Sequence, residues 1–174
     1  MDTEHVFWIT SRAAGVVALF ASSAAVTLGL LMAGRRGKRL RVAHEALSLA
    51  TIAAIVIHAA ALLGDGYLRP SLADVTIPFV SEYERVWTTT GIVAGWTLIV
   101  LGLSYYVRGR IGVARWRSLH RFTALAWLLG VLHGVMEGTD AGTAWFLITA
   151  AAAVLPACGL LAARLAASLA VQRT

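Results

Sequence analysis

The sequence has 174 residues, of which 59% are hydrophobic and 14% are charged, and its mean hydropathy is +0.75. This composition excludes an ordinary soluble domain, in which about half of the residues are apolar and about a quarter are charged, and it excludes a disordered chain. The single cysteine, Cys158, excludes a disulfide framework and a CxxC metal site.

Five long apolar runs follow one another along the chain, separated by short polar segments. They cover roughly residues 7–33, 43–63, 86–107, 118–136 and 142–165. Each run is long enough for a helix that crosses a bilayer, which takes about 17–25 residues. We therefore predict an all-α integral membrane protein, a five-helix transmembrane bundle that forms a single domain over residues 1–174.

The charges in the connections predict how this bundle is oriented. Most basic residues fall in the connections after the first and third runs and at the C-terminal end, which lie on one side if the spans alternate. These residues are Arg35, Arg36, Lys38, Arg39, Arg41, Arg108, Arg110, Arg115, Arg117, Arg121, Arg164 and Arg173. By the positive-inside rule that side is the cytoplasm. Of the acidic residues, only Glu45 shares it.

The predicted orientation therefore has an outer N-terminus and a cytoplasmic C-terminus, in a multi-pass protein of the plasma (inner) membrane. The net charge of +6 is then a topology signal. It does not indicate a nucleic-acid partner, because the cations are divided among membrane-flanking connections.

Four histidines lie inside predicted spans, two on the second and two on the fourth. His44 and His58 are 14 residues apart, and His120 and His133 are 13 residues apart. An ionisable side chain within a bilayer is costly, so each is a candidate functional residue. The two spans run in the same direction. At about 1.5 Å per residue, His44 and His120 share an inner level and the other two share an outer level about 20 Å away.

This arrangement suits two stacked haems, each with its iron held by one histidine from each helix. The haems would be b-type because the sequence has no CxxCH motif. Each ring would give one nitrogen to iron and donate its other N–H to a backbone carbonyl. The alternative is four separate structural histidines hydrogen-bonded inside the bundle, which the matched depths make the weaker interpretation.

The spacing of 13 residues is imperfect for this purpose. At about 100° per residue, it places His120 and His133 on nearly opposite faces of a straight helix. The fourth helix must therefore bend, rewind locally or present one ring sideways, and Gly130, which lies between the two histidines, could permit this.

These residues resemble the ferric reductase-like transmembrane domain superfamily, which includes ferric reductases, NADPH oxidases and the haem subunit of the bacterial methionine sulfoxide reductase system. Besides the paired histidines, the resemblance rests on WITSRAAG at Trp8–Gly15 and on DGYLRPSLADVTIPFVSEYERVW at Asp65–Trp87, which is typical of small bacterial members. It covers nearly the whole chain. It implies two b-type haems, with the inner one on His44 and His120 and the outer one on His58 and His133.

Four arginines are candidate partners of haem propionates. Arg12 lies about one turn inside the outer edge of the first span, where a guanidinium must find an anion or reach the interface. We expect a propionate of the outer haem as its partner, with lipid phosphate as the alternative. Arg41, Arg117 and Arg121 lie near the inner level, where one or more could pair with a propionate; for each alone, a role in topology and contact with anionic lipid is the stronger interpretation. Trp127, midway between the two levels, is expected mainly to pack against a neighbouring helix.

The chain also departs from the larger members of the superfamily, which continue into a cytoplasmic FAD and NADPH domain. It ends at Thr174, soon after the last span, and has no GxGxxG motif. We therefore expect a membrane-only member whose flavin is carried by a separate partner. The oxidases have a further histidine one turn after the first outer ligand. Here that position is Leu62, which argues against a dedicated producer of superoxide.

The resemblance implies the electron-transfer subunit of an oxidoreductase. Electrons would pass from a cytoplasmic flavoprotein or flavin reductase to an outer acceptor, which could be ferric iron, a quinone, oxygen or a partner protein. Two alternatives stay open: a haem-binding sensor without vectorial electron flow, and a structural subunit of a larger membrane redox complex.

Overall fold

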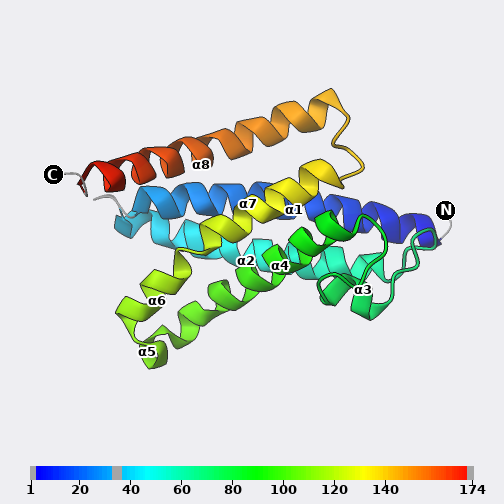
Figure 1. Cartoon of the computed structure of the whole chain (residues 1–174), viewed down its shortest axis with the longest axis horizontal. Helices are drawn as coiled ribbons and strands as arrows, with labels where there is room; N and C mark the ends of the chain where they lie inside the picture. Colours follow the sequence, from blue (N-terminus) through cyan, green and yellow to red (C-terminus); the bar gives the residue numbers. More distant parts are fainter. Residues whose placement is uncertain (1–2, 33–36, 172–174) are drawn as a thin grey trace.

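The structure, a computed structural model, describes residues 3–32 and 37–171. All of the regular elements in these ranges are helices (Figure 1). They are α1 (Thr3–Met32), α2 (Gly37–Leu62), α3 (Leu72–Thr76), α4 (Arg85–Leu103), the 3-10 helix η1 (Ser104–Val107), α5 (Arg108–Ile111), α6 (Val113–His120), α7 (Thr123–Met136) and α8 (Ala144–Val171).

Five helical stretches among the described residues are long and apolar enough to cross a membrane. They cover His5–Met32, Leu40–Leu62, Arg85–Ile111, Val113–Met136 and Ala144–Ala170. The predicted all-α bundle of five spans is thereby confirmed. Two of the spans are composite, because α4 continues through η1 and α5, and α6 is followed by α7.

The orientation of the bundle stays a prediction. The start of α1 and the end of α8 lie at opposite ends of the molecule, as an odd number of spans requires (Figure 1). Arg35, Arg36 and Arg173, which contributed to the prediction, lie outside the described residues. We keep the words inner and outer for the two levels of the bundle, as defined by the charge pattern.

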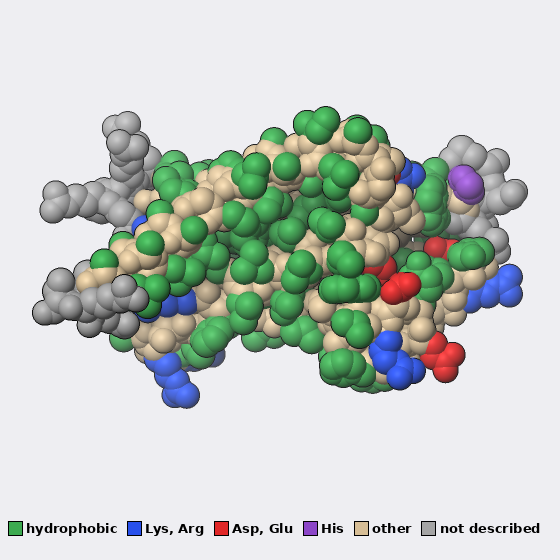
Figure 2. All heavy atoms as spheres, turned by 45° about the horizontal axis from the view of Figure 1, so that its top comes forward, with side chains coloured by type: hydrophobic (Ala, Val, Ile, Leu, Met, Phe, Trp, Pro, Cys, Tyr) green, Lys and Arg blue, Asp and Glu red, His purple; other side chains and the backbone are tan. Residues whose placement is uncertain are grey.

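The outside of the bundle is apolar along its middle. Val56, Val100 and Ile148, each within a span, are 52%, 60% and 69% exposed. Figure 2 shows an apolar band between two ends that carry the charged side chains, with the acidic ones at the end where α1 begins. Exposure of such a band to water would cost a free energy of about 25 cal/mol for each Å² of apolar surface. The same surface is compatible with lipid, as expected for a multi-pass membrane protein.

Helix α1 is the centre of the packing. It packs against α2, α7 and α8, while α4 packs mainly against α7. Most of its buried positions are small residues such as Ala14, Ser23 and Ala25, which let neighbouring helices approach closely. Trp127 on α7 is 1% exposed, and its indole Nε1 donates to Ser23 Oγ at 3.0 Å. The expected packing role of Trp127 therefore holds, and the hydrogen bond adds a polar tie between α1 and α7.

The fourth span changes direction between α6 and α7. The N–H of Phe122 donates to Leu119 O at 3.0 Å, and the N–H of Ala124 donates to Arg121 O at 3.2 Å. Both bonds reach back three residues, so the α-helical ladder gives way to tighter turns at this point.

The expectation that Gly130 provides this change is wrong. Gly130 lies inside α7, where an added Cβ would meet the Cβ of Ala94 at an ordinary 3.8 Å. The break precedes α7 instead, directly after His120. This position re-aims His133 relative to His120 and leaves the remainder of the span as a regular helix.

Candidate functional site

Two pairs of histidine rings face one another across the bundle. The inner pair, His44 on α2 and His120 on α6, has ring centres 6.4 Å apart and ring planes at 83°. The outer pair, His58 on α2 and His133 on α7, has ring centres 6.2 Å apart and planes at 72°. A metal ion bound by two imidazoles through bonds of about 2.0–2.1 Å would separate the ring centres by roughly 6.4 Å. Both pairs therefore have the spacing of two ligands that share one ion.

The backbones that carry these rings are held apart. Helix α2 packs against α1 and more lightly against α4, and α7 packs against α4 and α1, but within the described residues α2 does not pack closely on α6 or α7. A cavity of about 370 Å³ opens between them at the inner level, and His44 and His120 are part of its lining. The rings thus reach across a space between helices, as ligands of a planar cofactor must.

Three of the four rings are oriented by a hydrogen bond to the backbone of a neighbouring helix. Nδ1 of His44 lies 2.9 Å from Ala25 O, and Nδ1 of His58 lies 2.9 Å from Ser11 O, both on α1. Nδ1 of His133 lies 3.1 Å from the carbonyl oxygen of Trp87 on α4. A carbonyl only accepts, so Nδ1 carries the proton in each case. Nε2 is then the unprotonated nitrogen with a lone pair for a metal.

A glycine accompanies each of these carbonyls, four residues later in the same helix. An added Cβ at Gly15 would lie 3.2 Å from Nδ1 of His58, and one at Gly29 would lie 3.2 Å from Cε1 of His44. At Gly91 it would lie 2.7 Å from Nδ1 of His133, closer than real Cβ atoms come. The glycine therefore makes room for the ring that bonds the carbonyl one turn earlier.

The arrangement on α1 could have been found in the sequence. Gly15 and Gly29 are 14 residues apart, as are His44 and His58. Because α1 and α2 are consecutive spans and run in opposite directions, equal spacings bring both glycines to both rings at once.

His120 is the exception. Its Nδ1 is buried and has no hydrogen-bond partner among the described residues. The turn of α4 that lies 14 residues after Trp87 and Gly91 holds Leu101 and Tyr105, and the α-helix ends at Leu103. At this level the carbonyl of Leu101 still approaches His120 without the geometry of a hydrogen bond, and Tyr105 takes the place of the glycine.

The ring of His120 is instead positioned by an aromatic neighbour. Trp116 stacks on it with ring centres 4.8 Å apart and planes at 25°. Trp116 is itself fixed, because its Nε1 donates to Ser104 Oγ at 3.0 Å. The inner pair therefore combines one hydrogen-bonded ring with one stacked ring.

Cations and phenols surround the inner cavity. Arg41 and Arg108 both contribute to its lining. The guanidinium of Arg41 donates to the hydroxyl of Tyr105, and that of Arg108 lies 3.9 Å from the centre of the same ring. Of the inner arginines singled out from the sequence, only Arg41 reaches the cavity. Arg108 had been assigned to topology alone, and Arg117 and Arg121 are not among the lining residues.

At the outer end, Arg12 has a protein partner that the sequence analysis did not consider. Its Nε donates to Asp140 Oδ2 at 2.6 Å, and its second nitrogen bonds Oδ1 of the same carboxylate. Asp140, in the connection between α7 and α8, is 4% exposed. This two-pronged ion pair fastens α1 to that connection. Contact of Arg12 with a propionate stays a prediction.

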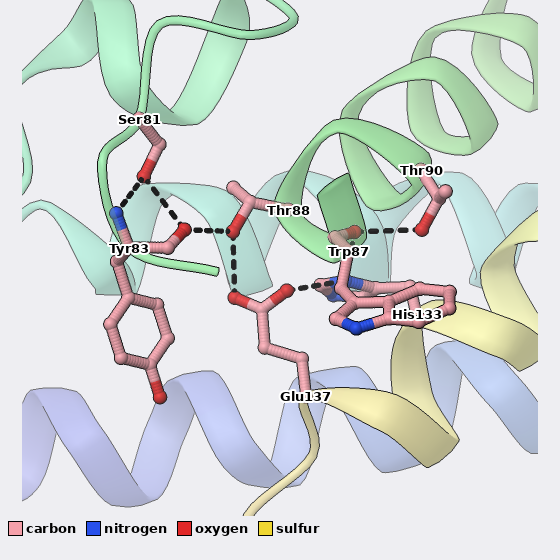
Figure 3. A network of polar contacts seen from close by, with 7 residues as sticks. All are labelled: Ser81, Tyr83, Trp87, Thr88, Thr90, His133 and Glu137. Atoms are coloured by element: carbon pink, nitrogen blue, oxygen red, sulfur yellow. Dashed lines mark hydrogen bonds and ion pairs between the residues drawn. The ribbon is translucent and has the colours of Figure 1, made fainter. Parts of the chain in front are cut away.

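Another acidic side chain at the outer level, that of Glu137, contacts His133 (Figure 3). Glu137 directly follows α7, and its Oε2 lies 3.1 Å from Nδ1 of His133. Its Oε1 accepts from Thr88 Oγ1 at 2.9 Å. The sequence analysis did not single out Glu137 as a site residue.

The donor set at each level consists of two imidazoles. Among residues 3–32 and 37–171, no group of three or more His, Cys, Asp or Glu side chains could hold a metal ion. Two imidazoles at the separation of ligands that share one ion, together with the cavity and its basic side chains at the inner level, fit a haem with two axial histidines, since the porphyrin supplies the other iron ligands.

Comparison with known proteins agrees with this chemistry. The family model described as "Ferric reductase like transmembrane component" matches residues 10–131, more than half of the chain. The match includes His44, His58 and His120 and ends two residues before His133. No curated protein and no solved structure matches the chain.

The close approach at Gly91 gives a test of the outer pair. In a helix interior, Gly→Ala usually adds up to about 1 kcal/mol of stability. In Gly91→Ala the new methyl group displaces the His133 ring, so we expect loss of most haem from the outer level. Gly159→Ala is the matched control, because a Cβ there meets nothing within 4 Å. Haem content and reduced-minus-oxidised spectra of both variants measure the effect. Equal haem content in the two would contradict this role of Gly91.

Proposed function

The chain belongs to the family of ferric reductase-like transmembrane components, which gives it a role in membrane electron transfer, and we propose that it is a cytochrome with two b-type haems. It receives electrons on the cytoplasmic side from a separate flavoprotein or flavin reductase. It delivers them to an acceptor on the outer side. In this proposal His44 and His120 are the ligands of the inner haem, and His58 and His133 are the ligands of the outer haem.

The observation that carries this proposal is the pair of ring separations, 6.4 and 6.2 Å, at two levels of one bundle. Four unrelated structural histidines would have no reason to meet in pairs at the distance between two ligands of one metal ion. The hydrogen bonds from Nδ1 support the same conclusion, because they leave Nε2 of three rings free for iron.

The chain contributes binding, insulation and electrostatics. When bound, the two haems would supply irons that take up and release one electron at a time. Arg41 and Arg108 at the inner cavity are the candidates to neutralise propionates at that level. Arg12, already paired with Asp140, is the candidate at the outer level. Trp127 fills the space between the levels and keeps water out of it.

Substitution of single histidines tests the assignment of ligands. His58→Ala or His133→Ala removes a ligand of the outer pair, so each variant should lose one haem of two and keep the inner one. His44→Ala or His120→Ala should do the reverse, and His5→Ala should keep both. Haem-to-protein ratios and redox titrations distinguish these cases. If His44→Ala and His133→Ala affected the same haem, the proposed pairing would be wrong.

Vesicles of opposite orientation test the direction of transfer. Reduced FMN carries a phosphate and crosses membranes poorly, so it reaches only one face of a sealed vesicle. We expect fast haem reduction in inside-out vesicles and slow reduction in right-side-out vesicles. His44→Ala, which lacks the inner haem, should lose the fast phase. Equal rates from the two faces would contradict a cytoplasmic entry point, and absence of reduction from either face would favour a haem-binding sensor.

A further inference from the structure

We propose that Glu137 lowers the reduction potential of the outer haem through the ligand His133. This inference rests on the proposed function, because it concerns a potential that exists only if the outer histidine pair binds haem. Glu137 would act as a positioning residue, since it touches the ligand and not the iron.

The carboxyl group lies directly against the ring nitrogen that faces away from the metal position. Oε2 of Glu137 is 3.1 Å from Nδ1 of His133, and Trp87 O is 3.1 Å from the same atom. The ring N–H donates to Trp87 O, and the carboxyl oxygen lies beside it without the geometry of a hydrogen bond, so its effect on the ring is electrostatic. The Oε2 atom is buried, and the Glu137 side chain is 14% exposed. Water therefore screens this contact weakly.

The carboxyl group is held in this position from the other side. Thr88, near the start of α4, donates to Oε1 of Glu137 at 2.9 Å and lies 2.8 Å from Tyr83 O (Figure 3). The backbone N–H of Glu137 donates to His133 O at 2.9 Å. Main chain and side chain are both fixed, so the contact with His133 is a defined feature of the fold.

Helix capping does not explain an acidic residue at this position. The C-terminal end of a helix carries partial negative charge, so an acidic side chain there is unfavourable. Glu137 follows the last residue of α7, Met136. A glutamine could accept the Thr88 hydrogen bond without that cost, so the carboxylate implies a role that needs its charge.

That role follows from the chemistry of an imidazole ligand. A negative charge beside Nδ1–H draws the proton toward it and raises the electron density on the ring. Nε2 then becomes a stronger donor, which stabilises ferric over ferrous iron and lowers the potential. The other three rings lack this device: His44 and His58 face neutral carbonyl oxygens, and His120 has no partner at Nδ1 within the described part of the chain.

The test compares two acid-to-amide variants of the full-length protein. Glu137→Gln keeps the shape of the side chain and its hydrogen bond with Thr88 but removes the charge. The midpoint potential of the outer haem should therefore move to more positive values. The inner haem should keep its potential, and the protein should keep two haems. Glu82→Gln is the matched control, because Glu82 is exposed in another outer connection, the one between α3 and α4. It makes the same change in net charge and should move neither potential.

Two further measurements separate an electronic role from a structural one. The ferric EPR signal of the outer haem should shift in Glu137→Gln while that of the inner haem stays. Glu137→Asp keeps the charge but withdraws it from Nδ1, so it should raise the outer potential by a smaller amount.

An unchanged outer potential in a Glu137→Gln protein with two haems would overturn this inference and leave the diheme proposal intact. Loss of the outer haem from Glu137→Gln would also overturn it, because the carboxylate would then be required for haem binding and not for setting the potential. A wild-type protein without haem would instead overturn the proposed function itself.

Discussion

The hydrogen bond from an imidazole Nδ1–H to a carbonyl of a neighbouring helix is the interaction on which the rest of the structure depends. An unpartnered ring N–H in hydrocarbon would cost several kcal/mol. Ser11, Ala25 and Trp87 provide the carbonyls, and a glycine one turn later admits each ring. These contacts set the register of α1 against α2 and of α4 against α7. They also decide which ring nitrogen faces the centre of the bundle, and so they link helix packing directly to ligand geometry.

The two levels differ in ways that suit different tasks. The inner level has a cavity of about 370 Å³ with Arg41 and Arg108 in its lining, and the proposed ligand His120 is held by stacking on Trp116. The outer level has two acidic side chains with fixed protein contacts: Asp140 binds Arg12, and Glu137 lies beside His133. An anionic flavin donor would meet positive charge at the inner level, whereas the outer level holds its ligand with fixed negative charge.

Hydropathy and charge predicted the class of protein, the number of spans and the histidine levels, because these depend on composition along single helices. The rotation of each helix depends on contacts between helices and was not predictable in the same way. The bend assigned to Gly130 occurs at Arg121–Phe122, since loss of the α-helical ladder there leaves no mark in the apolar pattern. The partner of Arg12, Asp140, follows from a tertiary contact alone. Glu137 lies four residues after His133, so that contact has a local i,i+4 spacing that could be read in the sequence. The equal spacing of the two glycines on α1 and the two histidines on α2 could be read in the sequence. It also gives the motif WITSRAAG a structural role, because this motif contains Ser11 and Gly15, which contact His58.

The central claim is that each histidine pair binds one haem with the ring planes as they lie in the fold. The most direct measurement is the ferric EPR spectrum of the purified wild-type protein, together with its haem content. Ring planes at 83° and 72° are close to perpendicular. The account predicts two non-covalent haems per chain, both low-spin, with the highly anisotropic signals of crossed imidazole planes. A high-spin signal, a rhombic signal of parallel planes, or fewer than two haems would contradict it.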